Sequence, residues 1–274
     1  SLICTDIVPT TNAQLNFPFG AGTSRLVIAS AESTLTQYGN NGGLLVPAGV
    51  GGYGDIIQSN GTLIAAEVAL GAAVGSEGRY FLLGGTNILT KTSAPSLFVG
   101  KASNSTGLMV VAGSDTLFSS TNSTGIALGG ENSTRTNSYG QMIVSNGTIK
   151  TRGLRLGNGT GCAGDFLLLD GTVINHTNGS GGFAITVGDG LRSTGRLVMA
   201  TALSLIDATE GPAGTPTTLG NSTGSVGILI MSNGTANLRR LVVANNGYGY
   251  VSMENQAVMN ITEGIYMPND SANN

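Results

Sequence analysis

The sequence is poor in charge, in aromatic residues and in cysteine. Charged residues make up 10% of its 274 residues, where a globular domain averages about 25%, and there are two cysteines and no tryptophan. The net charge is −3 and the sequence has no block of like charges, so it lacks the basic patch that would bind nucleic acid or an acidic membrane surface. We therefore expect neither nucleic acid nor a charged membrane as a partner.

Long hydrophobic runs are also missing. The longest apolar run, residues 63–75, is too short to span a bilayer and contains Glu67, so no membrane span is expected. No signal peptide is visible, and a chain that begins at Ser1 is expected to be a mature product that is secreted, extracellular or displayed on the cell surface.

Small turn-forming residues and short apolar runs are abundant. Gly, Ser, Thr and Asn together supply 124 residues, while the hydrophobic fraction of 40% falls in short runs such as "MIVS", "LFVG" and "ITVG". Scarce apolar residues would indicate disorder, but compact β-branched runs favour strands. The composition predicts a turn-rich, all-β protein.

Two glycine patterns recur along the chain. The first is a Gly, a spacer and an apolar run, which begins at Gly54, Gly78, Gly107, Gly140, Gly164, Gly195, Gly227 and Gly249, with a weaker copy at Ser24. The second is a short strand that ends at Gly71, Gly100, Gly129, Gly157, Gly188 and Gly220, and then at Asn245. The positions of the second pattern lie 29, 29, 28, 31, 32 and 25 residues apart.

A period of this length, built from short strands and polar turns, is typical of a solenoid. We predict an all-β fold, a parallel β-solenoid (β-helix) of about nine three-strand coils of roughly 22–33 residues each. The solenoid is expected over residues 23–267, with an N-terminal extended arm at 1–22 and a C-terminal tail at 268–274. An antiparallel sandwich or barrel is less consistent, because turns of one type recur at one place in each unit.

The repeats resemble the β-helical passenger repeats of bacterial autotransporter adhesins. Units of that family pass from a strand ending in Val-Gly, through a Gly/Thr-rich turn and an apolar strand, to Ser-Asn-Gly-Thr. Residues 219–247, "LGNSTGSVGILIMSNGTANLRRLVVANNG", match best, and the similarity extends loosely over residues 54–265. The resemblance implies a similar extracellular scaffold, but it does not imply autotransport.

Asn-x-Ser/Thr sequons occupy 12 of the 24 asparagines, where chance gives roughly five. The residue preferences of turns alone can produce such triplets, in which case no sugar is attached. Alternatively, N-linked glycans on these asparagines would supply the hydration that the missing charges do not. Seven sequons in loops are favoured as acceptors: Asn104, Asn122, Asn132, Asn158, Asn175, Asn178 and Asn221. Five are less favoured: Asn60, Asn146 and Asn233 at tight corners, where asparagines of adjacent coils are expected to stack, together with Asn260 and Asn269.

The two cysteines, Cys4 and Cys162, lie about five coils apart, too far for a disulfide between fixed coils. An extended arm at 1–22 could bring Cys4 back to Cys162 or across to the next subunit. The alternative is two unpaired thiols.

No catalytic residue, cofactor site or metal site is predicted. The lone His176 has no partner in the sequence, and the acidic residues are spread thinly. Polysaccharide-degrading β-helix enzymes need convergent carboxylates, for which Asp165, Asp170 and Asp189 are the best candidates. Their spacing makes no convincing pair.

The sequence therefore favours a structural subunit over an enzyme. We expect a secreted, N-glycosylated subunit of an extracellular filament or surface layer, which assembles with itself head to tail through the solenoid ends and the N-terminal arm. The alternative is a β-helical adhesin that binds a cell surface or glycan. A polysaccharide-degrading β-helix enzyme is a lesser alternative.

Overall fold

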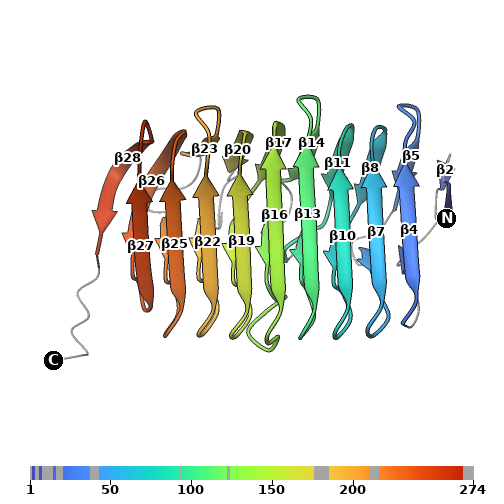
Figure 1. The fold of residues 1–274 in the computed structure, drawn as a ribbon, viewed down its shortest axis with the longest axis horizontal. Coiled ribbons are helices and arrows are strands. Elements are labelled where there is room, and N and C mark those ends of the chain that lie inside the picture. Colours follow the sequence, from blue (N-terminus) through green and yellow to red (C-terminus); the bar gives the residue numbers. More distant parts are fainter. Residues whose placement is uncertain are drawn as a thin grey trace.

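The chain forms a rod of stacked parallel strands. The computed structural model describes residues 2–3, 6–7, 15–16, 21–37, 43–92, 94–121, 124–175, 185–209 and 216–267. These residues contain 28 short strands and no helix, and the chain winds steadily from one end of the rod to the other (Figure 1). Each strand pairs in parallel with a strand of the neighbouring coil, which confirms the predicted parallel β-solenoid.

The first face of the rod is a ten-stranded sheet. Along this face, each strand pairs with the strand one coil further on. In order, its strands are β1 (Leu2–Ile3), β4 (Thr23–Ile28), β7 (Tyr53–Gln58), β10 (Glu77–Leu82), β13 (Thr106–Ala112), β16 (Tyr139–Ser145), β19 (Ala163–Leu168), β22 (Thr194–Met199), β25 (Val226–Met231) and β27 (Tyr248–Met253).

Two further ladders complete each coil. The second face consists of β2 (Asp6–Ile7), β5 (Thr34–Thr36), β8 (Thr62–Ala65), β11 (Thr86–Leu89), β14 (Leu117–Ser120), β17 (Gly147–Thr151), β20 (Gly171–Asn175), β23 (Leu205–Ala208), β26 (Thr235–Val243) and β28 (Val258–Tyr266). The third consists of β3 (Leu15–Asn16), β6 (Gly43–Val46), β9 (Glu67–Leu70), β12 (Leu97–Val99), β15 (Ile126–Leu128), β18 (Leu154–Leu156), β21 (Ile185–Val187) and β24 (Thr217–Leu219). It ends on β26 and β28, which run on from the second face. Three strands per coil agree with the prediction.

The first glycine pattern forms one column on the first face. Gly54 pairs with Gly78, and the column continues in register through every later copy to Gly249. The residues that open these strands, from Thr23 to Tyr248, lie 30, 24, 29, 33, 24, 31, 32 and 22 positions apart. The pattern therefore marks the register, and these coil lengths fall within the predicted range.

Close backbone packing explains why this column is glycine. A Cβ added to Gly140 would lie 2.0 Å from the carbonyl oxygen of Val99 and 2.6 Å from the backbone nitrogen of Gly129. A Cβ on Gly107 would lie 2.2 Å from the nitrogen of Gly100. The corner between the third and first faces thus brings the two glycine columns together and leaves no room for a side chain.

The second glycine pattern supplies left-handed backbone at the same corner. Its six glycines have φ between +62° and +74°, where glycine is favoured. In the last copy, Leu219 pairs with Val243, so the residue equivalent to Gly220 is Ala244, with φ +62°. The prediction that Asn245 takes this place was wrong by one residue, because a non-glycine residue holds the left-handed turn there.

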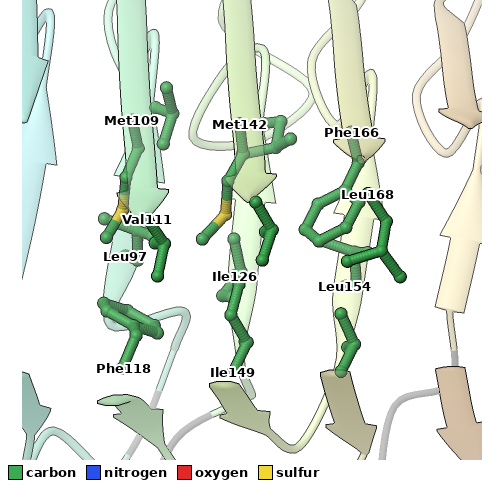
Figure 2. Packing of buried hydrophobic residues seen from close by; sticks show 14 of the residues in the cluster. Leu97, Met109, Val111, Phe118, Ile126, Met142, Ile149, Leu154, Phe166 and Leu168 are labelled. Atoms are coloured by element: carbon green, nitrogen blue, oxygen red, sulfur yellow. The ribbon is translucent and has the colours of Figure 1, made fainter. Parts of the chain in front are cut away.

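Inward-pointing side chains stack coil upon coil. Figure 2 shows Met109, Met142 and Phe166, from β13, β16 and β19, lying in a row, and all three are fully buried. Equivalent columns from the other two faces join them in a single core cluster that runs along the rod. Burial of these columns is the main favourable term for a chain with so few charges.

One polar cluster interrupts the apolar interior. Tyr80 Oη donates to Gln58 Oε1 at 2.5 Å and accepts from Asn87 Nδ2 at 2.8 Å, and all three residues are fully buried. Gln58 Nε2 donates to the carbonyl oxygens of Gly61 and Thr86, both at 3.0 Å. Burial raises the pKa of Tyr80 well above its ordinary value, so the hydroxyl remains a donor.

The described part of residues 1–22 differs from the extended arm expected there. β1, β2 and β3 pair with β4, β5 and β6, so these short strands extend all three ladders by one rung. The glycine patterns do not mark this turn, because its three strands are only two residues long. The predicted tail at 268–274 lies outside the described residues.

Three successive coils form a larger repeat. The coil lengths given above follow the order long, short, intermediate, starting at Thr23, Thr106 and Thr194. The first strands agree: "TSRLVIAS", "TGLMVVAG" and "TGRLVMAT" open the three modules, and "YGDIIQSNGT", "YGQMIVSNGT" and "VGILIMSNGT" open the coils that follow. The three Ser-Asn-Gly-Thr copies accordingly lie 86 and 87 positions apart.

The corner between the first and second faces alternates with this module. In the first coil of each module it is wide, at residues 29–33, 113–116 and 200–204, whereas the two coils that follow turn within fewer residues. The wide corners rise above their neighbours at β4–β5, β13–β14 and β22–β23 (Figure 1). The last described coil, which turns at 254–257, departs from this order.

Gly140→Ala is expected to lower the free energy of unfolding by about 3 kcal/mol, because the added Cβ meets backbone that cannot move alone. Gly75→Ala is the control: its Cβ meets nothing within 4 Å, and only its φ of +66° opposes the change, at a cost of about 1 kcal/mol. Urea unfolding of both variants measures the difference. Equal losses would contradict the close-packing argument.

The polar cluster gives a second stability prediction. Tyr80→Phe should lower the free energy of unfolding by about 1–3 kcal/mol, because it leaves the buried polar groups of Gln58 and Asn87 without their hydrogen-bond partner. The second module holds Val144, Phe166 and Val173 at the three equivalent positions. The triple variant Gln58→Val, Tyr80→Phe, Asn87→Val should therefore recover most of the loss in urea unfolding. A triple variant less stable than Tyr80→Phe would refute this.

Candidate functional site

Most of the described sequons lie at two corners of the coil. Asn104, Asn132, Asn158 and Asn221 lie between the third and first faces, just beyond the second glycine column, as predicted. Asn60, Asn146 and Asn233 lie at tight corners between the first and second faces. The asparagine side chains of the two groups differ in their burial and in their hydrogen bonds.

Asn158 is buried, which contradicts the exposed position expected for it. The residue is 7% exposed, and its Nδ2 donates to the carbonyl oxygens of Gly130 at 3.1 Å and Glu131 at 2.8 Å. Nδ2 is the atom that an N-linked sugar would occupy. The sequence could not reveal this, because the partners belong to the preceding coil.

Asn221 belongs to a polar ladder that crosses three coils. Its Nδ2 donates to Asp189 Oδ1 at 2.8 Å, and its Oδ1 accepts from Asn245 Nδ2 at 3.0 Å. Asn246 Nδ2 adds a bond to its carbonyl oxygen at 3.1 Å. The amide of Asn221 is therefore engaged on both sides.

Asn104 and Asn132 are exposed, as expected. Asn104 has φ +56° and lies within 3.5 Å of Asn137 Nδ2 through its Oδ1. Asn132 Oδ1 accepts from both the backbone nitrogen and the hydroxyl of Thr134, at 3.0 and 2.6 Å. Both retain an Nδ2 without a hydrogen-bond partner among the described residues.

The Ser-Asn-Gly-Thr corners do not form the asparagine ladder expected of them. Asn60 and Asn233 instead bond to their own turns, where Oδ1 accepts from Gly61 N at 2.8 Å and from Gly234 N at 3.1 Å. The backbone nitrogen of Asn146 donates to the carbonyl oxygen of Asp170 at 3.1 Å. Stacking fails because these asparagines recur only once in three coils.

The remaining sequons are scattered. Asn260 lies exposed in β28, and its Nδ2 donates to Asn237 Oδ1 at 2.9 Å. Asn175 ends β20 and pairs with Thr151, and so lies in a strand rather than in the predicted loop. Asn122, Asn178 and Asn269 lie outside the described residues.

Cys162 occupies a position that other coils give to serine. It stands two residues before the glycine of its first strand, as do the buried Ser76, Ser105, Ser193 and Ser225. Its Sγ is free, 1% exposed, and accepts from Ser138 Oγ at 3.0 Å. Cys4 lies outside the described residues, so a bond between the two cysteines stays a prediction.

A hollow lies beside the first Ser-Asn-Gly-Thr corner. It is lined by residues 59–60 and 83–85 of two tight corners and by the wide corner 113–116 of the next module. Gly84 leaves the bottom of the hollow without a side chain. A Cβ there would lie 2.4 Å from the carbonyl oxygen of Ser59. Leu83 is 46% exposed at this place.

The candidate catalytic carboxylates do not come together. Asp165 lies on the first face, where it pairs with Arg196 (Nη2 to Oδ2, 2.7 Å) and accepts from Tyr139 Oη at 2.9 Å. Burial and this carboxylate raise the pKa of Tyr139 to about 12. Asp170 caps Gly171 at a tight corner, and Asp189 lies at the opposite corner near Arg155. Three different places on the coil offer no convergent pair.

Sequence reasoning missed an ionic cluster on the outer side of the third face. Glu67 pairs with Lys91 and Lys101, and Lys101 lies 4.8 Å from the ring centroid of Phe98. Phe98 itself is 1% exposed and packs with Ala69 outside the main core. Pairing across coils connects these residues, so their separation in sequence hides the cluster.

Over the described ranges, no three His, Cys, Asp or Glu side chains are grouped so as to hold a metal ion. No helix in that part of the chain is long and apolar enough to cross a membrane. Comparison with protein-family models, curated proteins and solved structures gives no match. The resemblance to autotransporter passenger repeats therefore rests on the sequence pattern alone, beyond the shared β-helical scaffold.

The thiol of Cys162 is expected to react with iodoacetamide at least about a hundredfold more slowly in the folded protein than in urea, because local opening must precede its exposure. Alkylation followed by mass spectrometry of the Cys162 peptide measures this. Cys162→Ser should change the unfolding midpoint little, since serine fills the same corner in other coils. Rapid labelling of the folded chain would contradict the buried position.

Proposed function

We propose that this chain is the structural subunit of a secreted, N-glycosylated extracellular filament or surface layer, in which copies stack head to tail through the solenoid ends. The observation that carries the proposal is an open edge at the last described coil. Coils inside the rod have a neighbour on each side, whereas β27 and β28, like β1, β2 and β3 at the opposite end, have a partner on one side only among the described residues.

Unpaired backbone groups support this proposal. The nitrogens of Tyr248 and Glu254 donate back to the preceding coil, to Ser225 and Met231. Peptide groups along a strand point alternately to either side, so those of Gly249, Val251 and Met253 face away from the rod. An edge of this kind is a template for another parallel strand.

Apolar side chains are exposed at the same edge. Val251, Ala257, Met259 and Ile261 extend the core but are only partly buried. The exposed large apolar and aromatic residues at this end are Tyr248, Tyr250, Met253, Val258, Ile265, Tyr266 and Met267. A further coil would cover the inward-facing members of this set and pair the free backbone groups.

A second copy of the chain is the occupant we infer. The opposite end of the rod begins with short strands on all three faces, β1, β2 and β3, which match the three-ladder edge that they would meet. A contact between opposite ends is heterologous, and when it does not close on itself it generates a filament. Secretion and glycosylation are supported by the sequons and the low charge.

Met253→Lys tests the stacking. Met253 is 45% exposed in the single rod, so lysine should leave the fold intact, but a stacked coil would bury its ammonium group without a partner. We expect the concentration needed for end-to-end particles, seen by electron microscopy and sedimentation, to rise by about tenfold or more.

Leu203→Lys is the matched control. Leu203 is 73% exposed at a wide corner on the side of the rod, so this change should leave assembly unaltered. Wild-type rods that remain single at high concentration would refute head-to-tail assembly. Equal effects of the two lysines would refute the role of the edge.

A further inference from the structure

The Ser-Asn-Gly-Thr corners leave the acceptor atom of their sequons open. Asn60 and Asn146 are exposed, and no described residue hydrogen-bonds to Nδ2 of either side chain. In Asn60 the Oδ1 is fixed by Gly61 N at 2.8 Å, which leaves the Nδ2 as the free end of the amide. These sites meet the steric requirement for an N-linked sugar better than Asn158 and Asn221, two of the corner sequons ranked above them by sequence.

Two of the sequons favoured by sequence fail the same requirement. Asn158 is 7% exposed with both bonds of its Nδ2 directed at backbone carbonyls, and Asn221 uses its Nδ2 to bond Asp189. A sugar on Asn158 would have to replace two buried hydrogen bonds, which costs about 1–3 kcal/mol for each group left unsatisfied. The folded chain therefore opposes glycosylation at Asn158.

The three-coil module places Asn60 and Asn146 equivalently. Each lies in the tight corner that follows a wide one, and each is followed by a second tight corner, at 83–85 and 169–170. Three coils correspond to about 14 Å of rise, so the two acceptors recur along one edge of the rod at that interval. Asn233 has the same tetrapeptide, but the next corner, 254–257, is longer.

Each acceptor has an apolar side chain and a wall beside it. At Asn60, the hollow is floored by Leu83 and Gly84 and bounded by the wide corner 113–116. At the place equivalent to Leu83, the second module has Leu169, 37% exposed, followed by the wide corner 200–204. A pyranose ring has C–H groups on its faces and hydroxyls at its rim, which suit an exposed leucine bordered by polar turn residues.

We propose that Asn60 and Asn146 carry N-linked glycans, and that the first sugar of each lies against the leucine and wide corner beside it. The donor is a glycosyl diphosphate carried on a lipid. The bond from its anomeric carbon to the diphosphate oxygen breaks, a bond from that carbon to Nδ2 forms, and the amide gives up one proton as the diphosphate leaves. The inference rests on the proposed function only for the claim that the chain is secreted.

Site occupancy in the secreted chain tests the proposal. The probe is the 274-residue chain, secreted from a host that glycosylates Asn-x-Ser/Thr and mapped by mass spectrometry after enzymatic deglycosylation, which converts each occupied Asn to Asp. We expect occupancy at Asn60 and Asn146 to exceed that at Asn158 by at least about tenfold. Bare Asn60 and Asn146, or Asn158 occupied to the same extent, would overturn the proposal.

Matched variants separate the sequon from the turn. Thr62→Ala and Thr148→Ala should each remove one glycan from the intact mass, Thr62→Ser and Thr148→Ser should retain it, and Thr160→Ala should change nothing. A glycan lost with Thr160→Ala would contradict the assignment. Transfer to the urea-unfolded chain in vitro is the further control, since Asn158 should accept sugar there and not in the folded chain.

The glycan sites and the filament can be refuted independently, because the two experiments give different outcomes. Unglycosylated chains that still form end-to-end particles would overturn the glycan sites alone. Single rods with modified Asn60 and Asn146 would overturn assembly alone.

Discussion

The contact on which the rest of the rod depends is the backbone approach between the two glycine columns. At this corner, a position such as Gly140 lies so close to Val99, at the end of β12, that no Cβ fits, while the partner column turns through left-handed backbone. Together the columns fix where each coil ends and the next begins. Once that register is set, every inward side chain meets its counterpart one coil away, and the apolar columns follow.

The glycines also explain how much of the fold was predictable. Gly54 to Gly249 are visible in sequence because their chemistry is local and recurs, so the coil lengths and the three-strand unit could be inferred. Partners supplied by a neighbouring coil could not be inferred. The backbone oxygens that hold Asn158, the aspartate that holds Asn221, and the cluster around Glu67 all depend on register between segments about 24–34 residues apart.

The same limit governed the candidate sites. Asn158 was favoured because it follows the second glycine pattern and was expected to lie exposed at a corner of the coil, yet its side chain is held by the carbonyl oxygens of the preceding coil. The Ser-Asn-Gly-Thr spacing of 86 and 87 residues was present in the sequence and would have revealed the three-coil module. The dominant period of one coil concealed it. Ala244 shows the converse, because a left-handed turn without glycine leaves no signal in the sequence.

The ladder geometry has a mechanical consequence. The hydrogen bonds between coils run along the rod, and the first and last described coils lie at opposite ends (Figure 1), so tension between those ends pulls directly on the ladders. A terminal coil that detaches frees 22 to 33 residues at once. That corresponds to about 75–110 Å of extended chain. Under load, the rod would therefore lengthen in coil-sized steps, each dissipating energy while the coils behind it keep their register.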